Sequence, residues 1–161
     1  MGFHPSAGVG GHCIPIDPSY LAWSAEQAGG TAKFINLANE VNLGMPEFVV
    51  DRVLKLFGGA ISKRAIRVIG VAYKPNVSDT RETPAQNIVS MLRAHGAQVT
   101  WHDPYVGTWL GETSHPLIGE YDLGLIVTAH SDMQLSSLID SGVLLFDTTG
   151  MYRHLAGVIA L

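Results

Sequence analysis

The chain has 161 residues, of which 47% are hydrophobic and 15% are charged, and its formal net charge at pH 7 is −4. This composition supports a packed core and excludes intrinsic disorder, while the negative charge disfavours non-specific binding of nucleic acid. No apolar run approaches the ~20 residues of a membrane span, and no signal-peptide pattern opens the chain. Because the single cysteine, Cys13, cannot form an internal disulfide, we expect a reducing, cytoplasmic location.

Residues 2–16 are rich in glycine and proline and indicate an ordered loop. Asp17 and Pro18 follow this loop, and they are typical of a helix N-cap and of a first helical position. We therefore expect a helix from Pro18 to Ala28, ended by the glycine pair that follows.

A second, longer helix is predicted over residues 31–57, because apolar residues recur there at steps near 3.6. Gly44 and Pro46 in its middle predict a kink or a break. Apolar residues cover much of the circumference of this helix, and exposed apolar patches of that breadth are rare on monomers. We therefore expect a homodimer formed through helix 31–57.

From residue 65 onward the pattern changes to strands that alternate with helices. The expected strands cover residues 66–72, 99–102, 122–128 and 143–146, and the expected helices cover residues 83–96 and 131–141. This order predicts an α/β fold with a mostly parallel sheet, in a domain of residues 61–161 that follows a helical domain of residues 1–60. Such sheets bind ligands at the carboxyl ends of their strands, so the site is expected in the loops that follow the strands.

Basic residues gather in one part of the chain, because most of the 10 Lys and Arg residues lie between residues 52 and 93. Acidic residues predominate between residues 103 and 147. A locally basic segment in an acidic chain favours a small anionic ligand over a polymer, although an ordinary solvated face is an equally good interpretation.

Cys13 follows a glycine-rich run and precedes a proline, a context that indicates a tight, exposed backbone. A lone cysteine is most often a small buried hydrophobe. As a nucleophile, its thiol would need a base or a positive field nearby. His12 and the start of the expected helix are local candidates for this role, and Asp17 is a candidate for orienting a water or a base.

A metal site built from His4, His12, Cys13 and Asp17 is a weaker hypothesis. The adjacent side chains of His12 and Cys13 would point in different directions, and the spacing matches no standard zinc pattern. We therefore expect no metal.

A second candidate site lies between the expected strand 66–72 and the helix 83–96, where a Rossmann-type fold carries its phosphate loop. The sequence there lacks G-x-G-x-x-G, but Lys74 and Arg81 near the helix N-terminus could form an anion cradle. A surface loop with incidental charges is an equally good interpretation. Asp103 ends the next strand, at the place of a ribose-binding acid, but the glycine fingerprint that accompanies such an acid is missing. The remaining histidines are interpreted as structural: His95, His115, His130 and His154.

Residues 8–18 read GVGGHCIPIDP, and residues 70–85 read Gly-x-Ala-Tyr-Lys-Pro-Asn-x-x-Asp-x-Arg-Glu-x-Pro-Ala. This ordered pair of motifs resembles the UDP-glucose/GDP-mannose dehydrogenase family. The first motif is most similar to the branch that acts on UDP-N-acetyl-glucosamine or UDP-N-acetyl-mannosamine. The resemblance covers roughly residues 2–150 and only the later part of a family member. The family's N-terminal NAD-binding domain and its upstream catalytic lysine and asparagine are absent from this sequence.

The resemblance implies a four-electron oxidation of the C6 alcohol of a UDP-sugar to a carboxylate, with two NAD+ as acceptors. Cys13 would be the nucleophile, forming a thiohemiacetal and then a thioester that water hydrolyses. Asp17 matches an aspartate that helps to orient this water. Residues 61–161 would be a Rossmann-like UDP-binding domain, preceded by a helical dimerisation segment with a long central helix over residues 31–57.

The resemblance also implies a set of binding residues. Tyr73 and Lys74 match residues that touch the substrate, and Arg81 matches one that reaches NAD. The loop that wraps the sugar nucleotide matches His4, Pro5, Ser6, Ala7, Gly8, Val9 and Gly10. Two departures are present: residues 147–150 read Asp-Thr-Thr-Gly where many members have an arginine, and Ser6-Ala7 replaces a common Gly-Pro.

Three functions are compatible with these residues. The leading hypothesis is the substrate-binding half of a nucleotide-sugar 6-dehydrogenase, which we expect to be inactive without an NAD-binding domain. The alternative is a non-catalytic UDP-sugar-binding or dimerisation module that works alone. The intact loop around Cys13 favours the first, because a pure binding module needs no nucleophile. A self-sufficient thiol enzyme is disfavoured, since only His12 and Asp17 are visible as a base and its orienting group.

Overall fold

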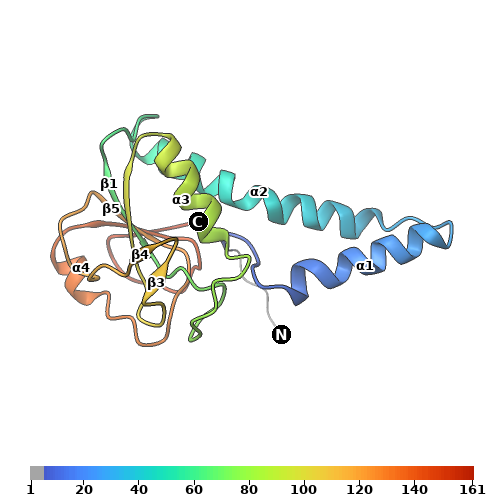
Figure 1. The fold of residues 1–161 in the computed structure, drawn as a ribbon. Helices are drawn as coiled ribbons and strands as arrows, with labels where there is room; N and C mark the ends of the chain where they lie inside the picture. Colours follow the sequence, from blue (N-terminus) through green and yellow to red (C-terminus); the bar gives the residue numbers. More distant parts are fainter. Residues whose placement is uncertain (1–5) are drawn as a thin grey trace.

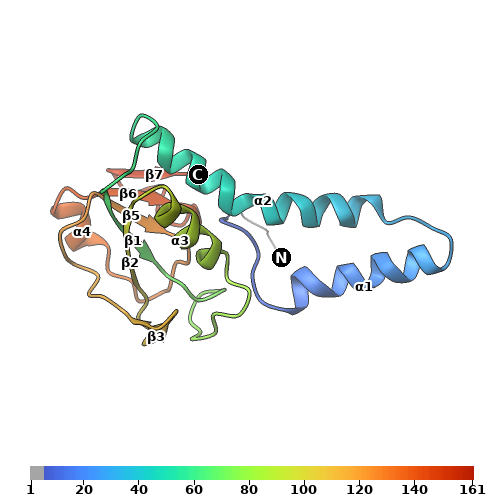
Figure 2. The same cartoon turned by 45° about the horizontal axis from the view of Figure 1, so that its top comes forward.

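The computed structural model describes residues 6–161. Helices α1 (Cys13–Gln27) and α2 (Lys33–Leu56) form a hairpin that projects from an α/β domain, as Figure 1 and the turned view in Figure 2 show. The tip of the hairpin, where α1 ends and α2 begins, lies farthest from the sheet in both views. Across residues 6–161, no helix combines the length and the hydropathy of a membrane span.

A five-stranded sheet forms the centre of the α/β domain, in the order β2-β1-β5-β6-β7. Every neighbouring pair in this sheet is parallel. The strands are β1 (Ala65–Ile69), β2 (Gln98–His102), β5 (Leu123–Ile126), β6 (Leu144–Asp147) and β7 (Val158–Ala160). The remaining elements are α3 (Pro84–Ala94), α4 (Ser136–Asp140) and an antiparallel pair of short strands, β3 (Thr108–Trp109) and β4 (Glu112–Thr113). The predicted α/β class with a parallel sheet is confirmed.

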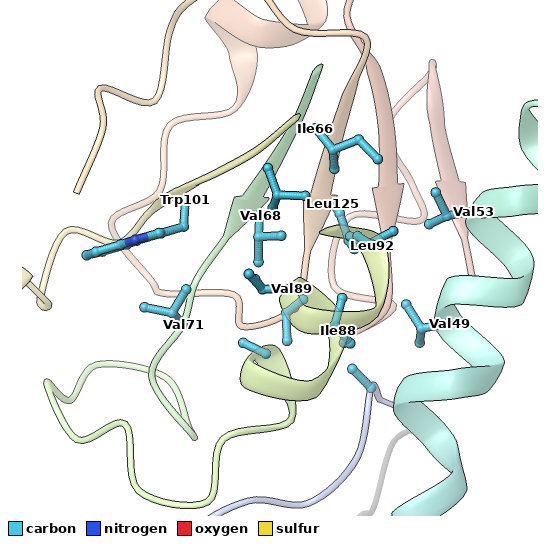
Figure 3. Packing of buried hydrophobic residues seen from close by; sticks show 14 of the residues in the cluster. Val49, Val53, Ile66, Val68, Val71, Ile88, Val89, Leu92, Trp101 and Leu125 are labelled. Atoms are coloured by element: carbon cyan, nitrogen blue, oxygen red, sulfur yellow. The ribbon is translucent and has the colours of Figure 1, made fainter. Parts of the chain in front are cut away.

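The sheet separates two apolar cores. Ile66 and Val68 of β1 belong to the larger core, which lies between the sheet, α3 and the second half of α2 (Figure 3). Other members of this core in the same view are Val49, Val53, Val71, Ile88, Val89, Leu92, Trp101 and Leu125. Ile69 belongs to a smaller core that also contains Leu138 of α4. Because side chains alternate along a strand, β1 supplies both cores.

Helix α1 begins at Cys13, so the predicted start at Pro18 is wrong. Pro18 lies inside the helix, where it removes a single backbone donor. The chain is anchored just before the helix, because the N–H of Gly11 donates to the carbonyl oxygen of Arg81 at 3.2 Å. The cap pattern of Asp17 and Pro18 is local, and it contains no information about this long-range contact.

Helix α2 begins at Lys33 and continues through Pro46, so of the predicted kink or break, the break does not occur. Pro46 has no N–H for the carbonyl of Asn42 one turn earlier. However, Pro46 itself is buried, as are Val49 and Val53 further along the helix. Burial of this half of α2 against the core compensates for the missing hydrogen bond.

Two elements near the C-terminus differ from the prediction. Helix α4 covers only part of the expected helix 131–141. The edge strand β7, which pairs with β6, is absent from the prediction. A strand of 3 residues has too few positions to show the alternation by which strands are identified in a sequence.

Candidate functional site

The loop that follows β1 leaves the carboxyl edge of the sheet where the strand order reverses. The chain passes from β1 through α3 to β2 on one side, whereas β5 lies on the other side of β1. In doubly wound sheets this switch point is the usual position of a ligand. The loop carries Tyr73, Lys74 and Arg81, three of the predicted site residues.

The glycine-rich loop before Cys13 docks onto this second loop. The N–H of Gly11 donates to the carbonyl oxygen of Arg81 at 3.2 Å. A Cβ atom at Gly10 would lie 2.6 Å from the carbonyl oxygen of Glu82, and one at Gly11 would lie 2.7 Å from Cε2 of Tyr73. Side chains at these two positions would therefore separate the loops, so the glycines permit the contact between the two motifs.

Helix α2 supplies a second anchor for the same loop. The N–H of Val9 donates to Oδ1 of Asn42 at 2.7 Å, and Nδ2 of Asn42 donates to the carbonyl oxygen of Val9 at 3.2 Å. The N–H of Gly8 donates to the hydroxyl of Ser6 at 3.3 Å. Ala7 is 1% exposed and joins the larger core. These contacts fix the backbone of residues 6–11 between α2, α3 and the loop after β1.

Cys13 is exposed and is the first residue of α1. The backbone N–H groups of a first helical turn have no partner within the helix, so they place partial positive charge near this end. Asp17 is exposed and lies one turn further along α1, and His12 is exposed at the N-cap position. His4 and Pro5 lie outside the described residues.

Tyr73 connects the cysteine loop with Lys74. Its ring faces Gly11, and the Nζ atom of Lys74 lies 5.3 Å from the centre of the same ring. The backbone N–H of Tyr73 donates to the carbonyl oxygen of Asp79 at 2.9 Å, which closes the loop. Lys74 is exposed, so its ammonium group is free to meet an anion.

Arg81 is paired with Asp79. Nε of Arg81 donates to both carboxylate oxygens at 3.0 Å, and Nη2 donates to Oδ2 at 2.5 Å. These hydrogen bonds lower the pKa of Asp79 to about 2. Asp79 in turn raises the pKa of Arg81, and Tyr73 and Cys13 make smaller contributions in the same direction.

A shallow pocket borders the docked loops. Its volume is about 190 Å³, and it is lined by Gly8, Val9, Asn42, Glu82 and Pro84, among others. Pockets for drug-sized ligands usually measure about 300–1,000 Å³, so this one alone cannot enclose a nucleotide sugar. Residues 6–161 contain no group of three or more His, Cys, Asp or Glu side chains arranged to hold a metal ion.

Asp103 cannot act as a ribose-binding acid, because its carboxylate is fully used inside the protein. It is 2% exposed. Its Oδ1 atom accepts the N–H of Tyr105 at 2.8 Å and that of Val106 at 3.2 Å. Its Oδ2 atom accepts the N–H of Val71 at 2.8 Å and that of Ala72 at 3.0 Å.

Residues 147–150, where many family members carry an arginine, form a turn that hydrogen bonds close in this chain. Asp147 is 0% exposed. Its Oδ1 atom accepts the N–H and the hydroxyl of Thr149 at 2.8 and 2.7 Å, and its Oδ2 atom accepts the N–H of Tyr152 at 2.8 Å. The carboxylate therefore stabilises the turn after β6.

Two residues at the site were not singled out in the sequence. Asp79 is separated from Arg81 by one residue, and this spacing is a signal that could have identified the pair. Asn42 has no such signal, because a single asparagine on an amphipathic helix does not reveal which loop it contacts. Only the tertiary structure brings Asn42 to Val9.

The parallel sheet, with two docked loops near its switch point, defines a doubly wound α/β protein. Residues 67–154 match the model of the UDP-glucose/GDP-mannose dehydrogenase family, UDP binding domain, and residues 1–43 match the central domain of the same family. The chain belongs to the UDP-glucose/GDP-mannose dehydrogenase family, which confirms the resemblance of the two motifs.

Known relatives are nucleotide-sugar dehydrogenases. A UDP-N-acetyl-D-mannosamine dehydrogenase of Methanococcus maripaludis is 45% identical over 103 residues, which cover 63% of this chain and 23% of that protein. The UDP-glucose 6-dehydrogenase TuaD of Bacillus subtilis is 39% identical over 97 residues, which cover 60% of this chain and 21% of that protein. The solved UDP-D-ManNAc dehydrogenase of Pyrococcus horikoshii matches with a TM-score of 0.76 and 28% identity, over 97% of this chain and 38% of that one. This chain therefore spans well under half the length of these relatives.

Proposed function

We propose that this chain is the C-terminal, substrate-binding half of an NAD-dependent nucleotide-sugar 6-dehydrogenase, which oxidises the C6 alcohol of a UDP-sugar to a uronate. The observation that carries this proposal is the docking of the cysteine loop onto the loop after β1. That contact holds Gly11, two residues before Cys13, against Tyr73 and Arg81, which supports placing the three side chains in one site.

Cys13 would act as the nucleophile in this reaction. After the C6 alcohol has lost a hydride and a proton, the thiol adds to the aldehyde to form a thiohemiacetal. Loss of a second hydride and proton gives a thioester. Water, oriented by Asp17, hydrolyses the thioester, which yields the carboxylate and frees the thiol. Each of the two oxidations removes two electrons as a hydride.

NAD+ is the acceptor that we propose, and when bound it takes up the hydride of each oxidation. Arg81 is the residue of this chain that would reach it. The Arg81 side chain is 65% exposed, and a planar guanidinium suits a pyrophosphate. Asp79 holds the Nε side of the group and so fixes its orientation.

The UDP-sugar would lie against the loop after β1. We assign Lys74, stacked on Tyr73, to charge-assisted contact with the nucleotide sugar. The backbone of residues 4–10 would wrap the sugar nucleotide, and the anchors at Asn42 and Ser6 support residues 6–10 for this purpose.

The chain contains no G-x-G-x-x-G, so we propose that it does not reduce NAD+ alone. Steady NADH formation by the purified chain with UDP-N-acetyl-glucosamine would contradict this. A cytoplasmic location stays a prediction.

The hairpin supports a homodimer formed through α2, the helix expected at residues 31–57. An apolar groove of about 700 Å³ runs along it, between α1 and α2. Phe34 is 83% exposed and Val41 is 58% exposed on α2. Because exposed apolar patches of this extent are rare on monomers, we propose that a second copy covers them.

The alternative is a stand-alone, non-catalytic UDP-sugar-binding and dimerisation module. The intact loop at Cys13 disfavours it, because a pure binding module needs no nucleophile. Fusing an NAD-binding domain of the family to the chain distinguishes the dehydrogenase proposal from the non-catalytic module. The dehydrogenase proposal predicts activity that Cys13→Ser abolishes, whereas full activity in that variant would remove Cys13 from the mechanism.

Calorimetric titration with UDP tests the substrate assignment. Removing a charge-assisted hydrogen bond costs about 1.5–3 kcal/mol, so Lys74→Ala should raise the Kd of UDP about 10- to 150-fold. Arg81→Ala should change the Kd much less. Lys55→Ala, which removes an exposed positive charge at the end of α2, is the matched control. Equal affinities for wild type and Lys74→Ala would contradict the assignment, and a larger loss from Arg81→Ala would mean that the two roles are reversed.

A further inference from the structure

Asp103 and His130 form a buried pair at the carboxyl edge of the sheet, after β2 and β5 respectively. Nε2 of His130 lies 3.1 Å from Oδ2 of Asp103, and both side chains are 0% exposed. The His130 ring stacks on Tyr105, with the ring centres 4.8 Å apart. The proposed reaction uses neither member of the pair, although burying titratable groups is costly unless they are hydrogen-bonded.

Asp103 holds the beginning of the loop after β1. Its Oδ2 atom accepts the N–H groups of Val71 and Ala72 at 2.8 and 3.0 Å. Burial alone would raise the pKa of Asp103, but the hydrogen bonds from His130 and from backbone N–H groups outweigh it, so the pKa lies below its usual value. The group that anchors the loop is therefore a charged carboxylate.

His130 holds the same loop further along. Its Nδ1 atom accepts the backbone N–H of Asn76 at 2.9 Å, so the ring proton lies on Nε2 and is donated to Asp103. The Asn76 side chain adds to this anchor, because its Oδ1 atom accepts the N–H and the hydroxyl of Ser131 at 2.9 and 3.0 Å.

Tyr73 and Lys74 lie between these two anchors, one residue after Ala72 and two residues before Asn76. We propose that Asp103 and His130 are positioning residues, which hold the substrate-binding loop so that Tyr73 and Lys74 present a preformed contact to the nucleotide sugar. This inference rests on the proposed function of Lys74. The pair acts on the loop from both ends, and a displacement at either end moves the Lys74 ammonium away from its ligand.

Amide hydrogen exchange without nucleotide tests the anchoring by itself. His130→Phe keeps the ring that stacks on Tyr105 but removes both nitrogens, so the amide of Asn76 should exchange faster than in wild type. His130→Asn places an amide oxygen near the former Nδ1 atom, and it should restore slow exchange at Asn76. Unchanged exchange at Asn76 in His130→Phe would overturn the proposal.

Calorimetry with UDP tests the effect on binding, at a temperature at which every variant is folded. We expect His130→Phe to raise the Kd of UDP by about 10-fold, the lower end of the loss predicted for Lys74→Ala. His130→Asn should recover most of the affinity. Leu138→Ala creates a cavity in the smaller core, beneath α4, and is the control for destabilisation alone. An equal rise in Kd for Leu138→Ala would assign the effect to general stability and overturn the proposal.

A double-mutant cycle then tests whether the pair acts through Lys74. In a Lys74→Ala background, His130→Phe should cause little further loss of UDP affinity, since both changes remove the same contact. Fully additive losses would overturn the positioning role. Failure of the wild-type chain to bind UDP would refute the proposed function and the positioning role with it, whereas the exchange result at Asn76 would still report whether the pair anchors the loop.

Discussion

The α/β domain and the α1–α2 hairpin place their apolar side chains in opposite ways. In the α/β domain they fill cores on both faces of the sheet, and all of the largest fully buried side chains lie at Ile61 or beyond. In the hairpin many are exposed, namely Ile14, Ile16, Tyr20, Leu21, Trp23, Phe34, Leu37, Val41, Leu43 and Phe48. The apolar side chains of the domain are thus buried within one copy, whereas those of the hairpin stay exposed and are the surface that the proposed second copy would cover. The proposed site lies where the two regions meet.

Truncation of a core residue should have the largest effect. Leu125→Ala in β5 should lower the free energy of unfolding by about 2–5 kcal/mol, since Leu125 is 0% exposed. Leu37→Ala in α2, where the side chain is 56% exposed, should change it by less than about 0.5 kcal/mol. Denaturant titration at a concentration at which the chain is monomeric measures both. Equal losses would remove the contrast between the regions.

A charged substitution on the exposed face of the hairpin should instead affect association between copies. Phe34 is 83% exposed, and full burial of such a ring contributes about 1.5–3 kcal/mol per copy, so Phe34→Asp should strongly weaken a dimer. Light scattering should then give 17.3 kDa for the variant and about twice that for wild type. Ile118→Asp, which places the same charge at a 62% exposed position of the α/β domain, is the control. A wild-type mass near 17.3 kDa at micromolar concentration would contradict the dimer.

A smaller effect is expected at the junction between the regions. Asn42→Ala removes the acceptor of the Val9 N–H, a hydrogen bond with a net value of about 0.5–1.5 kcal/mol, so exchange of the Val9 amide should become roughly 2- to 10-fold faster. Asn39→Ala removes a different α2 amide, which bonds to Ser19 on α1, and should leave Val9 unchanged. Similar exchange at Val9 in all three proteins would show that Asn42 does not hold the loop.

The smallest effect is the titration of Asp79. Its pKa of about 2 is depressed in the folded chain, so the stabilisation from its pair with Arg81 is complete above the unfolded pKa. That stabilisation is lost as the pH falls through about 2. In Arg81→Ala the pKa should return towards the ordinary value near ~3.9. Carboxyl-carbon NMR measures both values, and an Asp79 pKa near the ordinary value in wild type would contradict the pairing.

The order of elements in the α/β domain could be predicted from the sequence because each core-facing pattern is local. The start of α1 could not be predicted, because the chain just before it is held by a long-range contact between Gly11 and Arg81 that no local pattern reveals. Asp17 and Pro18 form a strong local cap pattern, but tertiary docking outweighs it. The edge strand β7 was missed because it is too short to carry a pattern.

The residues of the candidate site also divide into those with a local sequence signal and those that depend on long-range contacts. Cys13, Tyr73, Lys74 and Arg81 belong to contiguous motifs, so a single sequence suffices to single them out. The residues that hold those motifs in place cannot be singled out in this way, because they are far apart in the chain from the loops that they contact. Asp103 and His130 meet only after β2 and β5 are aligned in the sheet, and no sequence spacing indicates that pair.

The central claim is that the cysteine loop and the loop after β1 form one binding site. Cys13 is exposed and is the only cysteine, so its alkylation by iodoacetamide can be followed by mass spectrometry without ambiguity. Saturating UDP-N-acetyl-mannosamine should slow this alkylation, and UDP alone, which lacks the sugar, should slow it less. Identical alkylation rates with and without saturating UDP-sugar would contradict the claim that the two loops share one ligand.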